Sequence, residues 1–216
     1  MRYAILLGLL GAPGLYATAC EPDAVIAKLL IAQSLPGDIT ESKAGRRTRL
    51  IAEARKAVAA TPGSVWAHRA YVDAVIGEFG EGRTEAIEEY DALLAKAPRD
   101  PVMLYAAARA KYSRNTAEAI KHLEAAVALQ PGLGPAHALL AEIYASQSFR
   151  DTQKIREHLD AYAKSCPDSV DLSRVYGWLD DANLQRYIAD RARSTEPENA
   201  AAARRISEAL ESRIED

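Results

Sequence analysis

Few residues in this chain have the type and spacing that catalysis or metal binding would need. The sequence contains no HExxH, no paired cysteine ligands, no GxSxG and no phosphate-cradling glycine loop. His122 and His158 each stand just before a core leucine, but a shared metal would need facing side chains, which stacked repeats rarely allow. Serine, histidine and aspartate residues are scattered without a supporting motif. The sequence therefore predicts a protein that is not an enzyme and that holds no metal or cofactor.

One glycine-rich segment superficially resembles a nucleotide-binding loop. Residues 77–82 read GEFGEG, a G-x-x-G-x-G order that follows a predicted helix. A phosphate-binding loop needs a strand before it and a helix after it, and that context is missing. We therefore expect a roomy connector between two helices, and its glycines make it the most flexible internal point of the predicted fold.

The elements that must position any binding residue are helices with a repeated apolar stripe. Residues 116–131, TAEAIKHLEAAVALQP, place Ala119, Leu123 and Ala126 on one face and stop at Pro131. The two alanines let a neighbouring helix approach closely, while the leucine fills the gap between them. Residues 84–98 repeat the design, and weaker copies precede and follow it.

The prolines that end these helices recur at a nearly constant interval. Pro62, Pro98, Pro131 and Pro167 are separated by 36, 33 and 36 residues. A period in the mid-thirties is typical of stacked helical hairpins, none of which can bury its apolar face alone. Residues 22–34 and 47–61 are the predicted helices of a divergent first hairpin.

Composition and charge agree with an all-α fold and argue against a nucleic-acid partner. Apolar residues make up 49% of the 216 residues, enough for a packed interior, and runs of alternating β-branched residues are absent. The formal charge is −3, and the short basic cluster at Arg46, Arg47 and Arg49 is flanked by acids. Binding to a phosphate backbone would require a basic surface.

The first 19 residues read as an export signal. Arg2 supplies a minimal positive region, an uncharged stretch follows, and Ala17-Thr18-Ala19 is an A-x-A cleavage signal. The uncharged run from Tyr3 to Cys20 is broken by glycine and proline and is short for a membrane span. The sequence predicts an exported protein, located in the periplasm or anchored to the envelope membrane.

Cys20 follows the cleavage signal and resembles the terminal cysteine of the bacterial lipobox, which is lipidated. The departure is Ala17, where that motif usually has leucine. Three outcomes stay open: lipidation of Cys20, ordinary signal cleavage, and an uncleaved anchor. A lipid on Cys20 would be the chain's only membrane attachment and would leave Cys166 without an intrachain partner. Cys166 could then pair with another molecule or serve as a small buried residue.

The helical pattern resembles that of tetratricopeptide repeats (TPRs). That family places Trp, Leu, Gly or Ala, and Tyr on a first helix, then Ala, Phe or Leu, Ala and Pro on a second. The matching residues are His137, Leu140, Ala141 and Tyr144, then Ala119, Leu123, Ala126 and Pro131, and in an earlier unit Trp66, Ala70, Ala86, Tyr90, Leu93 and Pro98. The resemblance covers about residues 47–167 with good motifs.

This resemblance implies a right-handed superhelical solenoid of antiparallel helix pairs, with about four to five hairpins and a C-terminal capping helix. The implied organisation is a divergent hairpin at 20–62, three TPR-like repeats at 63–167, and a degenerate repeat with its capping helix at 168–216. In this family, side chains of the first helices line a concave groove. Mapped onto this chain, the groove residues are Tyr71, Tyr105, Arg109, Tyr112 and Glu142.

A groove lined by tyrosine and arginine suits a peptide, since tyrosine offers contact area at low entropic cost and arginine can fork onto a carboxylate. The leading interpretation is a non-catalytic scaffold of the bacterial envelope that binds a protein or peptide. The alternative comes from a looser resemblance, carried by LAEIYASQSFRD and CPDS, to repeat regions beside thioredoxin-like domains. It implies an accessory role in envelope thiol–disulfide chemistry and predicts a solvent-accessible Cys166, although the chain has no CxxC.

Overall fold

The computed structural model describes residues 20–34, 41–166, 188–189, 192–193 and 204. Within 20–34 and 41–166 the chain forms eight α-helices and one short 3-10 helix and contains no strand, which confirms the predicted all-α class. The elements are α1 (Ala24–Ser34), α2 (Lys43–Ala60), α3 (Val65–Ile76), α4 (Arg83–Lys96), α5 (Pro101–Lys111), α6 (Thr116–Leu129), α7 (Gly134–Ala145), η1 (Gln147–Phe149) and α8 (Thr152–Ser165). No helix in the described part is long and apolar enough to cross a membrane.

Polar caps and prolines set where these helices begin and end. The side chains of Ser64, Asp100 and Asn115 accept hydrogen bonds from backbone N–H groups at the starts of α3, α5 and α6. These bonds satisfy donors that the first turn of a helix leaves without an internal partner. At the other end, α2, α4 and α6 each stop two residues before a proline of the predicted series.

The predicted small-large-small stripe is the packed face of α6. Ala119, Leu123 and Ala126 are fully buried, and Ala86 and Tyr90 of the equivalent helix α4 are buried as well. Each helix of the series packs against the next one along the chain, and α3 also contacts α5. Adjacent helices therefore pack in the way a helical repeat requires.

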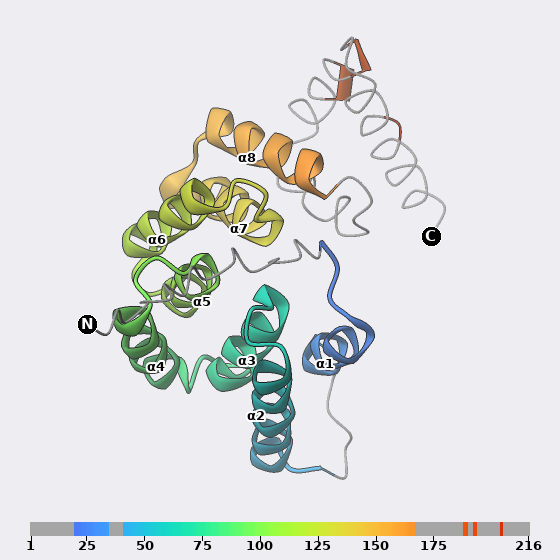
Figure 1. The fold of residues 1–216 in the computed structure, drawn as a ribbon, viewed down its shortest axis with the longest axis vertical. Helices are drawn as coiled ribbons and strands as arrows, with labels where there is room; N and C mark the ends of the chain where they lie inside the picture. Colours follow the sequence, from blue (N-terminus) through green and yellow to red (C-terminus); the bar gives the residue numbers. More distant parts are fainter. Residues whose placement is uncertain (1–19, 35–40, 167–187, 190–191, 194–203, 205–216) are drawn as a thin grey trace, which may run out of the picture.

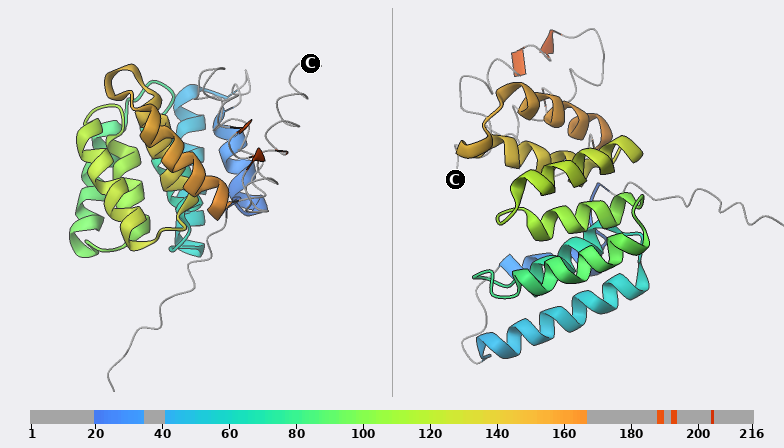
Figure 2. Two further views of the ribbon diagram at one scale, coloured as in Figure 1. Left: turned by 90° about the horizontal axis from the view of Figure 1, so that it is seen from above. Right: turned by 90° about the vertical axis from the view of Figure 1, so that its left-hand side faces the viewer.

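The helices follow one another around an arc, with α3, α5 and α7 on its inner side and α4, α6 and α8 on its outer side (Figure 1). The right-hand view of Figure 2 shows them stacked one above another from α2 to α8. Helix α1 departs from this order, because it lies against both α2 and α3 on the inner side.

A disulfide joins the two ends of this array. Cys20, just before α1, is bonded to Cys166, the residue that ends α8, across 146 positions of sequence. A sulfur in a disulfide cannot also carry a lipid through a thioether bond, so the predicted lipidation of Cys20 and the membrane attachment it would provide are incompatible with this structure. Cys166 is buried, as expected for a residue at the end of a repeat helix, but it is not a free thiol.

The connector at residues 77–82 is a turn between α3 and α4, as predicted. Gly77 and Gly80 have positive φ angles of 74° and 78°, which favour glycine. The predicted export signal at 1–19 and nearly all of the predicted degenerate repeat and capping helix at 168–216 lie outside the described residues.

Candidate functional site

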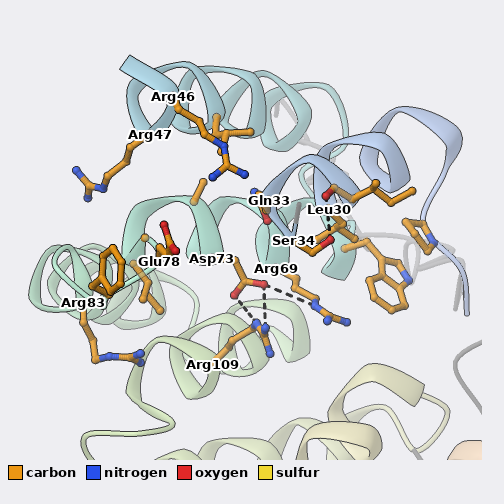
Figure 3. Close-up of a pocket in the computed structure, with 18 of the residues that line it drawn as sticks. Leu30, Gln33, Ser34, Arg46, Arg47, Arg69, Asp73, Glu78, Arg83 and Arg109 are labelled. Carbon is orange, nitrogen blue, oxygen red and sulfur yellow. Dashed lines mark hydrogen bonds and ion pairs between the residues drawn. The ribbon is translucent and has the colours of Figure 1, made fainter. Parts of the chain in front are cut away.

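A cavity of about 700 Å³ opens on the inner side of the arc. Its walls come from α1, α2, α3, the turn at residues 77–82, the first residue of α4, α5 and α7, so residues far apart in sequence meet there (Figure 3). A volume of this size is typical of a ligand site rather than of a packing defect.

The rim of the cavity carries exposed apolar side chains. Ile31 of α1 is 56% exposed and Phe79 of the turn is 73% exposed, and both line the cavity together with Leu30. The ammonium group of Lys43 lies 4.8 Å from the centre of the Phe79 ring, which orients that ring at the cavity mouth. Apolar groups left uncovered at a concave site are contacts that a ligand can bury.

An ion pair between neighbouring helices lies at the centre of the cavity. Arg109 of α5 donates from Nε and Nη2 to the two carboxylate oxygens of Asp73 on α3, at 2.6 and 2.8 Å. Burial alone would lower the pKa of Arg109, but the Asp73 carboxylate raises it above the ordinary value. The predicted carboxylate fork of Arg109 therefore exists, but its partner belongs to this chain.

Asp73, Arg109 and Glu142 occupy equivalent positions on α3, α5 and α7. They are separated by 36 and 33 residues, the same intervals that separate the first three helix-ending prolines. Glu142 accepts a hydrogen bond from the Tyr112 hydroxyl, and partial burial together with this carboxylate raises the pKa of Tyr112 to about 12. The cavity wall thus carries a charge series, negative, positive and negative, along successive repeats.

Arg69 is a second guanidinium beside the same carboxylate. It lies over the Trp66 ring at 5.1 Å, and its Nε is 3.8 Å from Asp73 Oδ2. The Arg69 side chain is only 20% exposed, and its buried Nε has no hydrogen-bond partner in the described part of the chain. Figure 3 shows both Arg69 and Arg109 reaching toward the Asp73 carboxylate.

The other arginines that line the cavity donate hydrogen bonds to backbone carbonyls at the C-terminal ends of helices. Arg46 donates to Ala32 O at 2.7 Å, Arg47 to Val75 O at 2.5 Å, and Arg83 to Ala110 O at 3.2 Å. These carbonyls lie in the last turns of α1, α3 and α5, where backbone acceptors lack internal partners and a positive charge is favourable. Their role is structural, which separates them from Arg69.

The structure brings three of the five predicted groove residues to the cavity: Arg109, Tyr112 and Glu142. It places the other two in the core, since Tyr71 is 4% and Tyr105 1% exposed, so neither can contact a ligand there.

Tyr71 lies two positions before Asp73 on α3, about 200° around the helix, and so faces away from the cavity. Its hydroxyl accepts from Arg55 at 2.9 Å and donates to Glu89 at 2.8 Å, which ties α2, α3 and α4 together. Tyr105 lies on the same side of α5 as Arg109 but is covered, and burial raises the pKa of its hydroxyl.

Sequence reasoning missed Arg69, Ile31 and Phe79. One signal was available for Arg69: Trp66, Arg69 and Asp73 follow one another at i, i+3 and i+7, which places them on one helical face. No local pattern could place Ile31 and Phe79 together, because tertiary packing brings α1 to the turn.

Among the described residues, no group of three or more His, Cys, Asp or Glu side chains could hold a metal ion. His158 is paired with His137 at 3.1 Å between their Nδ1 atoms, whereas Nε2 of His122 lies 3.4 Å from Glu118. Comparison of the chain with protein-family models, curated proteins and solved structures finds no match. The likeness to tetratricopeptide repeats therefore rests on the helix pattern alone.

Proposed function

We propose that this protein is a non-catalytic scaffold of the bacterial envelope that binds a peptide segment of a partner protein in the cavity. The observation that carries the proposal is the cavity itself, with exposed Ile31 and Phe79 at its rim and paired arginines at its centre. Apolar anchors around a few fixed polar groups are typical of protein-recognition sites.

For the architecture, we infer a TPR-like right-handed superhelical solenoid with about four to five hairpins and a C-terminal capping helix. The period of the prolines, the buried small-large-small stripes and the pairwise packing of adjacent helices support it. A solenoid presents an extended inner face made by successive repeats, which is where Asp73, Arg109 and Glu142 recur.

For the location, we infer export to the periplasm with ordinary cleavage after Ala19. The Cys20–Cys166 disulfide supports it, because disulfides persist in oxidising compartments and are rare in a reducing cytosol. Cleavage without lipidation leaves the Cys20 sulfur available for this bond.

The accessory role in thiol–disulfide chemistry is not favoured by any observation. It predicts that Cys166 is accessible and reacts with a partner's thiol, whereas Cys166 is buried and already bonded. Alkylation of the native protein without reductant should leave Cys166 unmodified, and rapid modification read by mass spectrometry would restore the alternative.

The peptide-binding proposal is tested by selecting binders from a displayed peptide library and measuring their affinity by calorimetry. The test variant is Ile31→Glu with Phe79→Glu, which places charge on two exposed rim residues without disturbing the core. The matched control is Val25→Glu with Leu129→Glu, two exposed apolar residues that do not line the cavity.

Selected peptides should lose at least about tenfold in affinity for the rim variant, because two carboxylates there would face the apolar side chains that the peptide is proposed to bury. They should bind the control variant as tightly as the original chain. Enrichment of no peptide, or equal binding to the rim variant, would overturn the proposal.

A further inference from the structure

We propose that the occupant of the cavity presents a carboxylate to Arg69, next to an apolar side chain that contacts Ile31 and Phe79. The inference rests on the proposed function, and it names the chemistry that the peptide must carry. It starts from the unequal contacts that two guanidinium groups make with one carboxylate at the centre of the cavity.

Two guanidinium groups share one carboxylate there. Asp73 has both oxygens engaged by Arg109 at 2.6 and 2.8 Å, which is the fork geometry that satisfies a carboxylate best. Arg69 approaches the same group only to 3.8 Å, and its buried Nε has no hydrogen-bond partner within the described residues. Glu142 also acts on Arg109, so what sets Arg69 apart in this group is its Nε, which lacks an acceptor.

Arg69 is also held in place for a ligand. The Trp66 ring under its guanidinium restricts its rotamers, so binding an anion there would cost little side-chain entropy. The Arg69 side chain is four-fifths buried, and the buried part of its guanidinium gives up water and then favours an acceptor. A carboxylate matches the planar fork of an arginine.

Several other charged groups around the cavity already have partners within the chain. Arg46, Arg47 and Arg83 bind backbone carbonyls at helix ends, and Glu142 accepts from Tyr112. Glu81 accepts from the backbone N–H of Phe79 at 3.1 Å and lies 3.7 Å from Arg47. Arg47 also has a buried Nε without an acceptor, but its Nη2 donates to Val75 O, whereas Arg69 approaches an acid only to 3.8 Å among the described residues.

The apolar rim determines what must accompany the acid. Leu30, Ile31 and Phe79 line the same cavity as Arg69, so a ligand that reaches the guanidinium also covers these side chains. A free inorganic anion would leave them exposed. A leucine-like residue beside a carboxylate would bury them and neutralise Arg69 in one binding event.

The test uses four small probes on the full chain. N-acetyl-leucine carries a terminal carboxylate beside an apolar side chain, and N-acetyl-leucinamide is its neutral match. Acetyl-Leu-Glu-amide moves the carboxylate to a side chain, and acetyl-Leu-Gln-amide is its neutral match. Binding is followed by NMR through the indole N–H of Trp66, which underlies Arg69; the Trp178→Phe variant assigns its signal.

At least one acidic probe should bind about tenfold or more tightly than its neutral match, because hydrogen bonds between two charged groups are roughly twice as strong as neutral ones. Tighter binding of N-acetyl-leucine would identify the carboxylate as that of a chain terminus. Tighter binding of acetyl-Leu-Glu-amide would identify it as that of an acidic side chain. Arg69→Gln should remove the preference for charge, while Arg99→Gln, an exposed arginine outside the cavity, should keep it. Circular dichroism of both variants verifies that they fold.

Equal binding of acidic and neutral probes, absence of any shift at Trp66, or a charge preference that survives Arg69→Gln would overturn the inference. The peptide-library experiment separates the failure of this inference from the failure of the proposed function. If library peptides bind the cavity without regard to acidic residues, peptide binding stands and the carboxylate requirement falls. If no library peptide binds, the proposed function itself falls.

Discussion

His137 and His158 meet in a hydrogen bond that only one pair of neutral tautomers can form. Nε2 of His137 faces the carbonyl oxygen of Pro131 at 2.9 Å, and because that oxygen only accepts, Nε2 must carry the proton. Nδ1 of neutral His137 then accepts from Nδ1–H of His158. Two repeats earlier, His68 faces Pro62 O in the same way and takes its second bond from Tyr90.

This pairing predicts a loss of stability in acid. Burial and the neighbouring His137 lower the pKa of His158 to about 4, and burial lowers the pKa of His137. Because the unfolded chain takes up protons near pH 6.5 and the folded pair does not, the free energy of unfolding should fall as pH drops from about 6.5 toward 4. Glu124, Glu157 and Lys154 also act on His158, and the two acids limit the effect.

The His158→Tyr variant tests this, because a tyrosine hydroxyl can donate to a histidine Nδ1, as in the His68–Tyr90 pair, without taking up a proton in this pH range. Urea unfolding measured across this pH range should show a shallower decline, with about one proton fewer taken up on unfolding. The His122→Gln variant, which removes a histidine outside the His137–His158 pair, is measured for comparison. An unchanged slope in His158→Tyr would contradict the lowered pKa of His158 in the folded chain.

Helix α6 provides a matched pair of leucines with opposite environments. Leu123 is fully buried and Leu129 is 40% exposed, although both lie on the same helix. Leu123→Ala should lower the free energy of unfolding by roughly 2–5 kcal/mol through the cavity it leaves, whereas Leu129→Ala should cost less than about 1 kcal/mol. Denaturant titration measures both, and similar losses would contradict the assigned packing face.

The turn between α3 and α4 needs a glycine at position 82, because the structure leaves no space for a side chain there. A Cβ at Gly82 would collide with the Val75 carbonyl oxygen and with Arg47, whose guanidinium binds that same carbonyl. Gly82→Ala should therefore cost roughly 1–3 kcal/mol of stability, as overpacking does. Glu78→Ala adds an alanine to the same turn at an exposed position and should change unfolding by less than about 0.5 kcal/mol. Equal effects in urea unfolding would remove the steric argument.

At the scale of single helices, the sequence predicts the repeated helices well and the residues at which they begin less well. Proline stops and alanine stripes are local signals, so the helices that they mark, such as α4 and α6, are found. The predicted start of the second helix at Arg47 is late, because Ser42 caps the helix and α2 begins at Lys43.

The candidate site is harder to predict, because a residue's face on its helix does not fix what covers it. The equivalent positions of Arg109 and Glu142 bring both to the cavity, whereas Tyr105, one turn before Arg109, is covered by its neighbours. The contribution of α1 depends on contacts between distant parts of the chain, which no local pattern encodes.

For the whole molecule, the Cys20–Cys166 bond turns an open row of helices into a closed loop. A repeat array contacts mainly its own neighbours, so its two ends are otherwise free to separate. Helix α1 lines the cavity and is fixed near its C-terminus by Gln33, which donates to Ala70 O at 2.8 Å. The disulfide fixes the chain just before its other end.

Reduction of this disulfide should lower the free energy of unfolding by up to about 5 kcal/mol, because the bond removes loop-closure entropy from an unfolded chain across 146 positions. Urea unfolding with and without dithiothreitol measures the loss. The Cys20→Ser, Cys166→Ser variant should be as stable as the reduced protein, and dithiothreitol should not change its free energy of unfolding. Thiol titration of the denatured chain should find no free thiol before reduction and both afterwards. Equal stability with and without reductant would show that the packing of α1 against α2 and α3 alone holds the first helix on the cavity wall.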